Sequence, residues 1–180
     1  GLSFLEDRMR LFASMGWEKR SRFVSMDNLH VTLRFLGDLD DETLEKAMEH
    51  GERLASETPA FSWRIARCTL FPRVSRARII AATVEAPQAM KQLVKDLEAA
   101  AIDMGLEPDT RAIKPHITVA RLKQANKRPN LPSRPGSIGQ KAETLILYRS
   151  EPTESGFDYT VLREWPLGAG SVDDSSSEEE

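Results

Sequence analysis

The sequence has little of what several common classes of protein require. Its single cysteine, Cys68, excludes an internal disulfide and any zinc site built from several cysteines. No run approaches the roughly 18 apolar residues of a transmembrane helix, and the first residues are too highly charged for a secretory signal. We therefore expect a monomer in a reducing, cytoplasmic setting, without membrane contact. Cys68 falls in a predicted strand, where a small buried side chain is expected rather than a nucleophile.

Motifs for several kinds of chemistry are also missing. There is neither a P-loop nor a Rossmann glycine pattern, so the sequence contains no motif that predicts binding of a nucleoside triphosphate or NAD. A G-x-S-x-G nucleophile turn is absent, as is the H-E-x-x-H spacing of zinc hydrolases. The sequence thus predicts a function that uses no cofactor and no metal.

Acidic residues are unevenly distributed. Five of them lie in the last eight positions, and without these five the net charge of −3 would become +2. Residues 110–142 contain no acidic residue at all. The same stretch holds eight basic residues: Arg111, Lys114, Arg121, Lys123, Lys127, Arg128, Arg134 and Lys141. This charge suits an anionic ligand, although a simple solvated basic loop explains it equally well.

Helical and strand patterns alternate along the chain, which predicts an α+β fold with antiparallel sheet. We expect helices near residues 3–16, 41–57 and 87–104. Strands are expected at 22–25, 29–36, 61–71, 77–85, 116–122, 142–152 and 157–167. The Pro/Gly-rich segment 123–140 is long for a compact domain and predicts a functional flap. One domain is expected over residues 1–167, followed by an acidic, disordered tail at 168–180.

A histidine and a threonine two residues apart occur twice, each time in an apolar strand pattern. They are His30 and Thr32 in "LHVTLRFLG", and His116 and Thr118 in "PHITVARL". Because side chains alternate across a strand, each pair shares one face while its apolar neighbours share the other. One copy alone would favour a structural histidine. Two copies in matching strands favour a functional site.

Two histidines and two hydroxyls suit one particular chemistry. Imidazole titrates near pH ~6.5, so one ring of a pair can be neutral while the other is charged. The neutral ring can take a proton from water, and the charged ring can give one to a leaving oxygen. Threonine hydroxyls can donate hydrogen bonds to phosphoryl oxygens. The pattern therefore predicts metal-free cleavage of a phosphodiester.

The segments "DNLHVTLRFLG" (27–37) and "KPHITVARL" (114–122) resemble the paired motifs of the 2H phosphoesterase superfamily. The chain is most similar to the RNA 2′,3′-cyclic phosphodiesterases, long called 2′-5′ RNA ligases. The resemblance implies a bilobal α+β fold with two pseudo-symmetric lobes around a central cleft. It implies opening of an RNA or nucleoside 2′,3′-cyclic phosphate to a 2′-phosphate, with reversible 2′-5′ ligation as a family possibility. The family's usual first strand has no counterpart ahead of the first predicted helix.

The resemblance also implies roles for individual residues. His30 corresponds to the proton donor and His116 to the proton acceptor. Thr32, Thr118 and Arg121 correspond to phosphate-binding residues, and Phe35 to an aromatic residue near the base. Arg121 and Phe35 each follow their histidine by five residues, so strict alternation puts them on the opposite face unless the strand bulges or ends. Phe35 fits core packing as well as base stacking.

Two other functions are compatible with the same motifs. The first is a nucleotide- or RNA-binding module that does not turn over its ligand. The second is an enzyme of the same kind that acts on another phosphoester, such as ADP-ribose cyclic phosphate. A binding module has no need for an acid and base pair, so the two histidines favour an enzyme.

Overall fold

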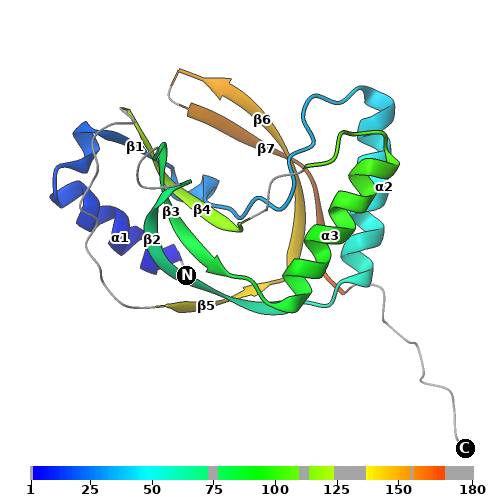
Figure 1. Cartoon of the computed structure of the whole chain (residues 1–180), viewed down its shortest axis with the longest axis horizontal. Helices are drawn as coiled ribbons and strands as arrows, with labels where there is room; N and C mark the ends of the chain where they lie inside the picture. The colour runs from blue at the N-terminus through cyan, green and yellow to red at the C-terminus, as the bar shows by residue number, and fades with distance from the viewer. Residues whose placement is uncertain (1, 73–76, 110–113, 124–136, 155, 169–180) are drawn as a thin grey trace, which may run out of the picture.

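A computed structural model describes residues 2–72, 77–109, 114–123, 137–154 and 156–168. These residues form three α-helices, two short 3₁₀ helices and two antiparallel sheets (Figure 1). The predicted α+β class with antiparallel sheets and flanking helices is confirmed. None of the helices within these ranges is both long and apolar enough to cross a bilayer.

The larger sheet has five strands in the spatial order β1-β4-β3-β2-β5, each antiparallel to its neighbours. They are Ser21–Phe23 (β1), Phe61–Phe71 (β2), Ile79–Glu85 (β3), His116–Leu122 (β4) and Ile138–Ala142 (β5). The strand that carries the second histidine motif, β4, lies inside the sheet. Because β1 and β3 hold its two edges, its backbone is a rigid support for side chains.

A second sheet consists of the hairpin β6 (Thr144–Thr153) and β7 (Gly156–Pro166). Two helices, α2 (Asp41–Glu57) and α3 (Gln88–Asp103), pack against each other, and α2 also contacts both strands of the hairpin. The Asp40 carboxylate caps α2 by accepting a hydrogen bond of 2.8 Å from the Thr43 backbone N–H.

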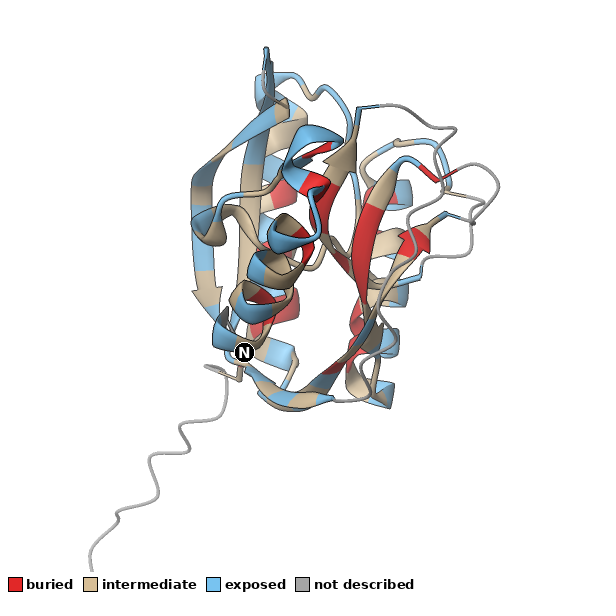
Figure 2. Ribbon diagram, turned by 90° about the vertical axis from the view of Figure 1, so that its left-hand side faces the viewer, coloured by how far each residue is buried: buried red, intermediate tan, exposed pale blue. Residues whose placement is uncertain are grey.

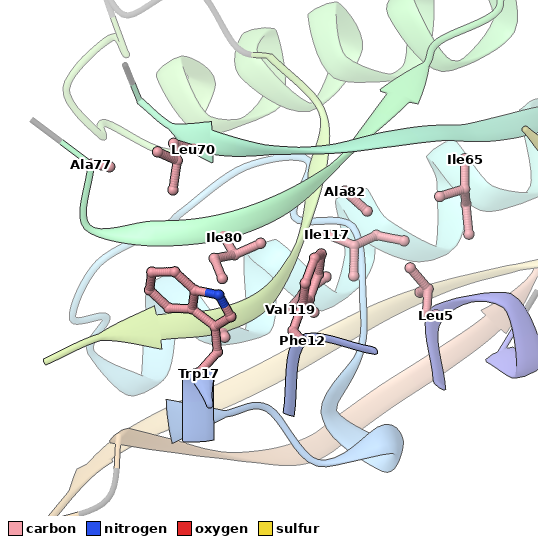
Figure 3. Packing of buried hydrophobic residues seen from close by; sticks show 11 residues of the cluster. Leu5, Phe12, Trp17, Ile65, Leu70, Ala77, Ile80, Ala82, Ile117 and Val119 are labelled. Carbon is pink, nitrogen blue, oxygen red and sulfur yellow. The ribbon is translucent and has the colours of Figure 1, made fainter. Parts of the chain in front are cut away.

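The first helix, α1 (Leu2–Ser14), covers one face of the five-stranded sheet and lies at the opposite end of the molecule from α2 and α3 (Figure 1). Leu5 and Phe12 of this helix are each 1% exposed and pack with Ile80 and Val119 of the sheet (Figure 3). Burying a side chain of this size contributes about 1.5–3 kcal/mol relative to leaving it exposed. This first core therefore fixes one face of the sheet and leaves the other free for a site.

A second core forms around Leu54 and Ala100, between α2 and α3. The extended segment 29–33 connects the two cores, since Leu29 and Val31 pack on the first and Leu33 packs on the second. Figure 2 shows the buried residues concentrated on the inner sides of helices and strands, with exposed residues on the outer surfaces. The first histidine motif is therefore anchored through alternate residues, as its pattern predicts.

The strand predicted over 29–36 is not a regular strand, and this part of the prediction is wrong. Only Val31 makes a ladder contact, and residues 32–37 have no regular structure. Between β1 and this segment the chain forms the 3₁₀ helix Met26–Asn28. β1 and Val31 both pair with β4 in antiparallel fashion. The chain therefore runs in the same direction along β4 before and after the 3₁₀ helix, and it loses contact with β4 only in between.

The other predicted elements agree with the structure, except that β5 was not predicted as a strand. The flap predicted over 123–140 falls mostly outside the described residues, and its last part belongs to β5. The tail predicted at 168–180 lies outside them from residue 169 onward. The helix patterns over 41–57 and 87–104 are confirmed.

Candidate active site

The two histidine motifs meet at one point on the free face of the larger sheet. Val31 forms an isolated antiparallel bridge with Ile117, and both of these side chains pack in the first core. The residues on either side of the bridge must therefore point to the opposite face. In this register the histidine of each motif lies opposite the threonine of the other. The four residues brought together in this way are His30, Thr32, His116 and Thr118.

The register sets the spacing of the site. Directly opposed side chains have Cβ atoms about 4.5–5.5 Å apart, whereas diagonal neighbours are about 7–8 Å apart. His30 and His116 are diagonal neighbours. A group as large as a phosphate can therefore lie between the two rings, with one threonine beside each histidine.

Both imidazole rings are held in the same way. The Nδ1 atom of His30 lies 2.7 Å from the carbonyl oxygen of Asn28, and Nδ1 of His116 lies 2.8 Å from that of Lys114. A carbonyl oxygen can only accept, so Nδ1 carries the hydrogen in each ring. In the described part of the chain, no residue hydrogen-bonds to Nε2 of either histidine. Each ring therefore has Nε2 available to exchange a proton with a ligand.

Aromatic side chains enclose the histidines differently. His30 packs against two neighbouring tyrosines of the hairpin, with Tyr159 at a centroid distance of 4.6 Å in an edge arrangement and Tyr148 at 5.4 Å; the two tyrosine rings are 6.0 Å apart. His116 instead stacks on Phe71 of β2, at 4.2 Å and 27°. The sequence analysis missed these three aromatic residues. They belong to strands remote from the motifs, and only the fold brings them to the histidines.

Arg121 reaches the histidine side of the sheet because β4 contains a bulge. The register to β3 shifts between Thr118 and Ala120, so Val119 is an extra residue in β4. Val119 and Ala120 are both 0% exposed and both belong to the first core. Alternation resumes after the bulge, which returns Arg121 to the face of His116. The sequence placed Arg121 on this face only if the strand bulged or ended before it, and the structure contains such a bulge.

The hairpin holds Arg121 from the other side. Its guanidinium lies over the Phe157 ring, 5.1 Å from the centroid, which is within range of a cation–π contact. Its charge is also close enough to His30 to act on the pKa of that residue. Arg121 thus lies between the larger sheet and the hairpin, beside the histidine pair.

The pKa of His30 is below its ordinary value. Burial of the ring is the largest cause, because it disfavours the charged form. The carbonyl of Asn28 opposes this shift, and the nearby positive charges of Arg121 and His116 lower the pKa further. An anion between the two histidines would offset these charges and favour the charged form of His30.

Phe35 is not part of either core. It is 62% exposed, so core packing, one of its two predicted roles, is excluded. Its neighbour Arg34 anchors this irregular segment to the other side of the molecule, where Nε lies 2.6 Å from a carboxylate oxygen of Glu98 on α3. Residues 32–37 have no regular structure, so the strict alternation of a strand does not apply to Phe35. Phe35 is therefore free to contact a ligand.

His116 also lines part of a groove at the larger sheet. Its volume is about 1430 Å³, and its described walls come from β2, β3, β5, the start of α3 and the residues before His116. Among the residues that the structure describes, no three side chains of the kinds that bind metals are clustered.

Comparisons with known proteins give a consistent picture. The family model described as LigT-like phosphoesterase matches residues 9–81 and 82–145. A protein of Methanothermobacter thermautotrophicus named RNA 2′,3′-cyclic phosphodiesterase is 29% identical over 152 residues, which are 81% of this chain and 82% of that protein. A protein of the same name from Aeropyrum pernix is 34% identical over 149 residues, which are 78% of this chain and 83% of that protein.

Solved structures show the same relationship. A crystal structure of a Thermus thermophilus protein has a TM-score of 0.82 and 26% identity, and covers 95% of both chains. The crystal structure of Escherichia coli LigT complexed with 3′-AMP has a TM-score of 0.77 and 25% identity, and covers 93% of this chain and 92% of that one.

Proposed function

Because the chain belongs to the LigT-like phosphoesterase family, we propose that it is an enzyme that opens the 2′,3′-cyclic phosphate of RNA or a nucleoside to a 2′-phosphate. The observation that supports this most directly is the convergence of two histidines from separate segments at the Val31–Ile117 bridge. Each of the two rings has Nδ1 held by a backbone carbonyl, which leaves Nε2 for proton transfer. The names of the curated relatives support the same activity.

The proposed mechanism uses the residues of the site in fixed roles. Thr32, Thr118 and Arg121 bind the non-bridging oxygens of the phosphate and hold it in line. His116 accepts a proton from water through Nε2 as the water oxygen attacks phosphorus. The bond from phosphorus to the 3′ oxygen breaks, and His30 donates its proton to that oxygen. The product is a 2′-phosphate, with His30 neutral and His116 protonated.

Because the pKa of His30 is lowered, binding of the negatively charged substrate would favour its protonation. Burial and the neighbouring positive charges lower the pKa of His30 and so disfavour its proton. The negative charge of a bound phosphodiester offsets those charges. We therefore propose that His30 gains its proton together with the substrate, and that Phe35, which is exposed, stacks on the base.

The same chemistry can use a different nucleophile. If the 5′-hydroxyl of an RNA replaces water, its attack on the cyclic phosphate gives a 2′-5′ linkage, and the reverse reaction regenerates the cyclic phosphate. Each positioned proton transfer contributes about 10²–10⁴ in rate whichever nucleophile is used. We propose ligation as a second, reversible activity of the site.

The first test is hydrolysis of nucleoside 2′,3′-cyclic phosphates in the presence of EDTA. We expect turnover to a 2′-phosphate, because all the proposed proton transfers use side chains. Loss of turnover on addition of EDTA would refute the metal-free mechanism. Tight nucleotide binding without turnover at any pH would instead indicate a binding module.

The histidine roles are tested by His30→Ala and His116→Ala. Each substitution should lower kcat about 10²–10⁴-fold, the usual contribution of one positioned proton transfer. His50→Ala is the matched control. His50 is on α2, where its Nε2 lies 3.3 Å from a carboxylate oxygen of Asp103 on α3, so its loss should leave kcat unchanged. Wild-type activity of either site variant would contradict the assignment.

A further inference from the structure

Two arginines lie directly opposite each other at the edge of the larger sheet. The register between β1 and β4 pairs Arg22 with Arg121. Directly opposed residues share one face of a sheet, and Arg121 is on the face of His116, so Arg22 is on that face as well. Its neighbours agree with this placement, because Ser21 is 2% exposed and Phe23 packs against the first core. The histidine face therefore extends from the histidine pair to Arg22.

The charges of these two arginines are not balanced by ion pairs. Like charges directly opposite each other destabilise a sheet. Within the described residues, neither arginine forms an ion pair with a carboxylate. Arg121 lies over the Phe157 ring. Arg22 is exposed and donates a hydrogen bond of 2.5 Å from Nη1 to the carbonyl oxygen of Glu154, which uses only one of its N–H donors. Both guanidinium groups therefore keep their charge and further donors for an anion.

Arg22 lies on the side of the site where the proposed reaction places the ribose. β3 occupies one edge of β4, so β1 and Val31 share the other edge. His30, next to Val31, lies opposite Thr118 in this register. Arg22 lies opposite Arg121, which is three residues further along β4. At about 3.3 Å for each residue the separation is about 10 Å, which one nucleotide and an arginine side chain can span.

We propose that Arg22 binds the phosphate on the 5′ oxygen of the nucleotide whose 2′,3′-cyclic phosphate lies between the histidines. In RNA this phosphate joins the terminal nucleotide to the rest of the chain. The inference deepens the proposed function and rests on its assignment of His30 to the leaving 3′ oxygen. The cyclic phosphate binds Arg121 and the preceding phosphate binds Arg22, so each of the two opposed charges is matched by a phosphate. The site thereby favours an RNA end over a nucleoside 2′,3′-cyclic phosphate.

The test uses substrates that differ in this one phosphate. They are 2′,3′-cyclic AMP, the same compound with a 5′-phosphate, and an adenosine dinucleotide that ends in the cyclic phosphate. We expect kcat/KM at low salt to be about tenfold higher for either substrate with a 5′ phosphate group, the effect of one hydrogen bond to a charged group. Raising the salt from about 50 to 200 mM should reduce this advantage about threefold, as for one phosphate contact of a single strand.

Arg22→Gln removes the proposed contact. The ratio of kcat/KM for the 5′-phosphorylated substrate to that for 2′,3′-cyclic AMP should fall about tenfold, and Arg22→Lys should retain part of the advantage. If Arg22 only supported the hairpin, both values would fall together and the ratio would not change. Arg149→Gln is the matched control and should leave the ratio unchanged. Arg149 is exposed on β6, and it alternates with Tyr148, which contacts His30, so it points away from the site.

Binding of the products examines the same contact without turnover. In calorimetry the wild type should bind adenosine 2′,5′-bisphosphate about tenfold more tightly than 2′-AMP, and Arg22→Gln should remove the difference.

The outcomes separate this inference from the proposed function. If the 5′ phosphate gives no advantage, or one that Arg22→Gln leaves intact, the inference is overturned and the proposed function stands. An advantage confined to the 5′-phosphorylated mononucleotide and missing from the dinucleotide would overturn the assignment to RNA. Failure to hydrolyse any of the cyclic phosphates would refute the proposed function, and the binding comparison would still decide whether Arg22 holds a second phosphate.

Discussion

Arg121→Gln tests the contribution of the β4 bulge to the site. The substitution keeps a polar side chain, although a shorter one, and removes a positive charge that lies between the larger sheet and the hairpin. A hydrogen bond to a charged group contributes about 1.5–3 kcal/mol. At about 1.36 kcal/mol for each factor of ten, loss of such a contact to the phosphate lowers kcat/KM about 10- to 150-fold. The same change removes one of the influences that lower the pKa of His30.

The direction of the pH effect follows from the role of His30. As a proton donor it must be protonated, so activity falls as the pH rises through its pKa. Arg121→Gln raises that pKa toward the ordinary value of ~6.5, and the basic limb of the kcat/KM profile should move to higher pH. NMR titration of the imidazole protons reports the shift directly. The His30 signal is identified by its absence in His30→Ala.

Two further variants make the result specific. Arg121→Lys keeps the positive charge but not the planar guanidinium group with its paired N–H donors. It should therefore lower kcat/KM while the pKa of His30 stays near the wild-type value. Arg53→Gln alters an exposed ion pair with Glu57 on α2 and should change neither quantity. If Arg121→Gln left both the rate and the titration of His30 unchanged, the placement of Arg121 beside the histidine pair would be wrong.

Two more predictions concern the scaffold. Gly51→Ala should destabilise the fold by about 1–3 kcal/mol in chemical denaturation, since the new Cβ would lie 2.6 Å from the Trp165 ring. Gly139→Ala, with no atom within 4 Å of its new Cβ, is the control, and an equal loss in both variants would exclude the steric explanation. Burial raises the pKa of the Cys68 thiol to about 11. Alkylation at pH 8 should therefore be on the order of a hundredfold slower than in the urea-unfolded protein, and similar rates would show that the thiol is accessible.

Most of the regular elements could be predicted from the sequence, because their patterns are long and their ends carry local signals. The Asp40 cap and the apolar spacing that follows it identify α2, and aromatic and β-branched residues identify β2 and β3. The segment after His30 was predicted wrongly as a strand. Its alternation is real, since Val31 and Leu33 pack inward, but they pack on two different cores. Alternate burial therefore arises here without a hydrogen-bonded ladder.

The histidine pair and the class of chemistry could be identified from the amino-acid order alone, because a repeated spacing of two residues places an imidazole and a hydroxyl on one face of an extended chain. How the two copies meet depends on the folded molecule. The bridge between Val31 and Ile117 sets the diagonal spacing of the histidines, and the extra residue Val119 turns Arg121 toward them. The tyrosines at His30 and the phenylalanine at His116 come from strands distant in sequence. Contacts of this kind depend on sheet register and on the packing of separate segments, which no local pattern specifies.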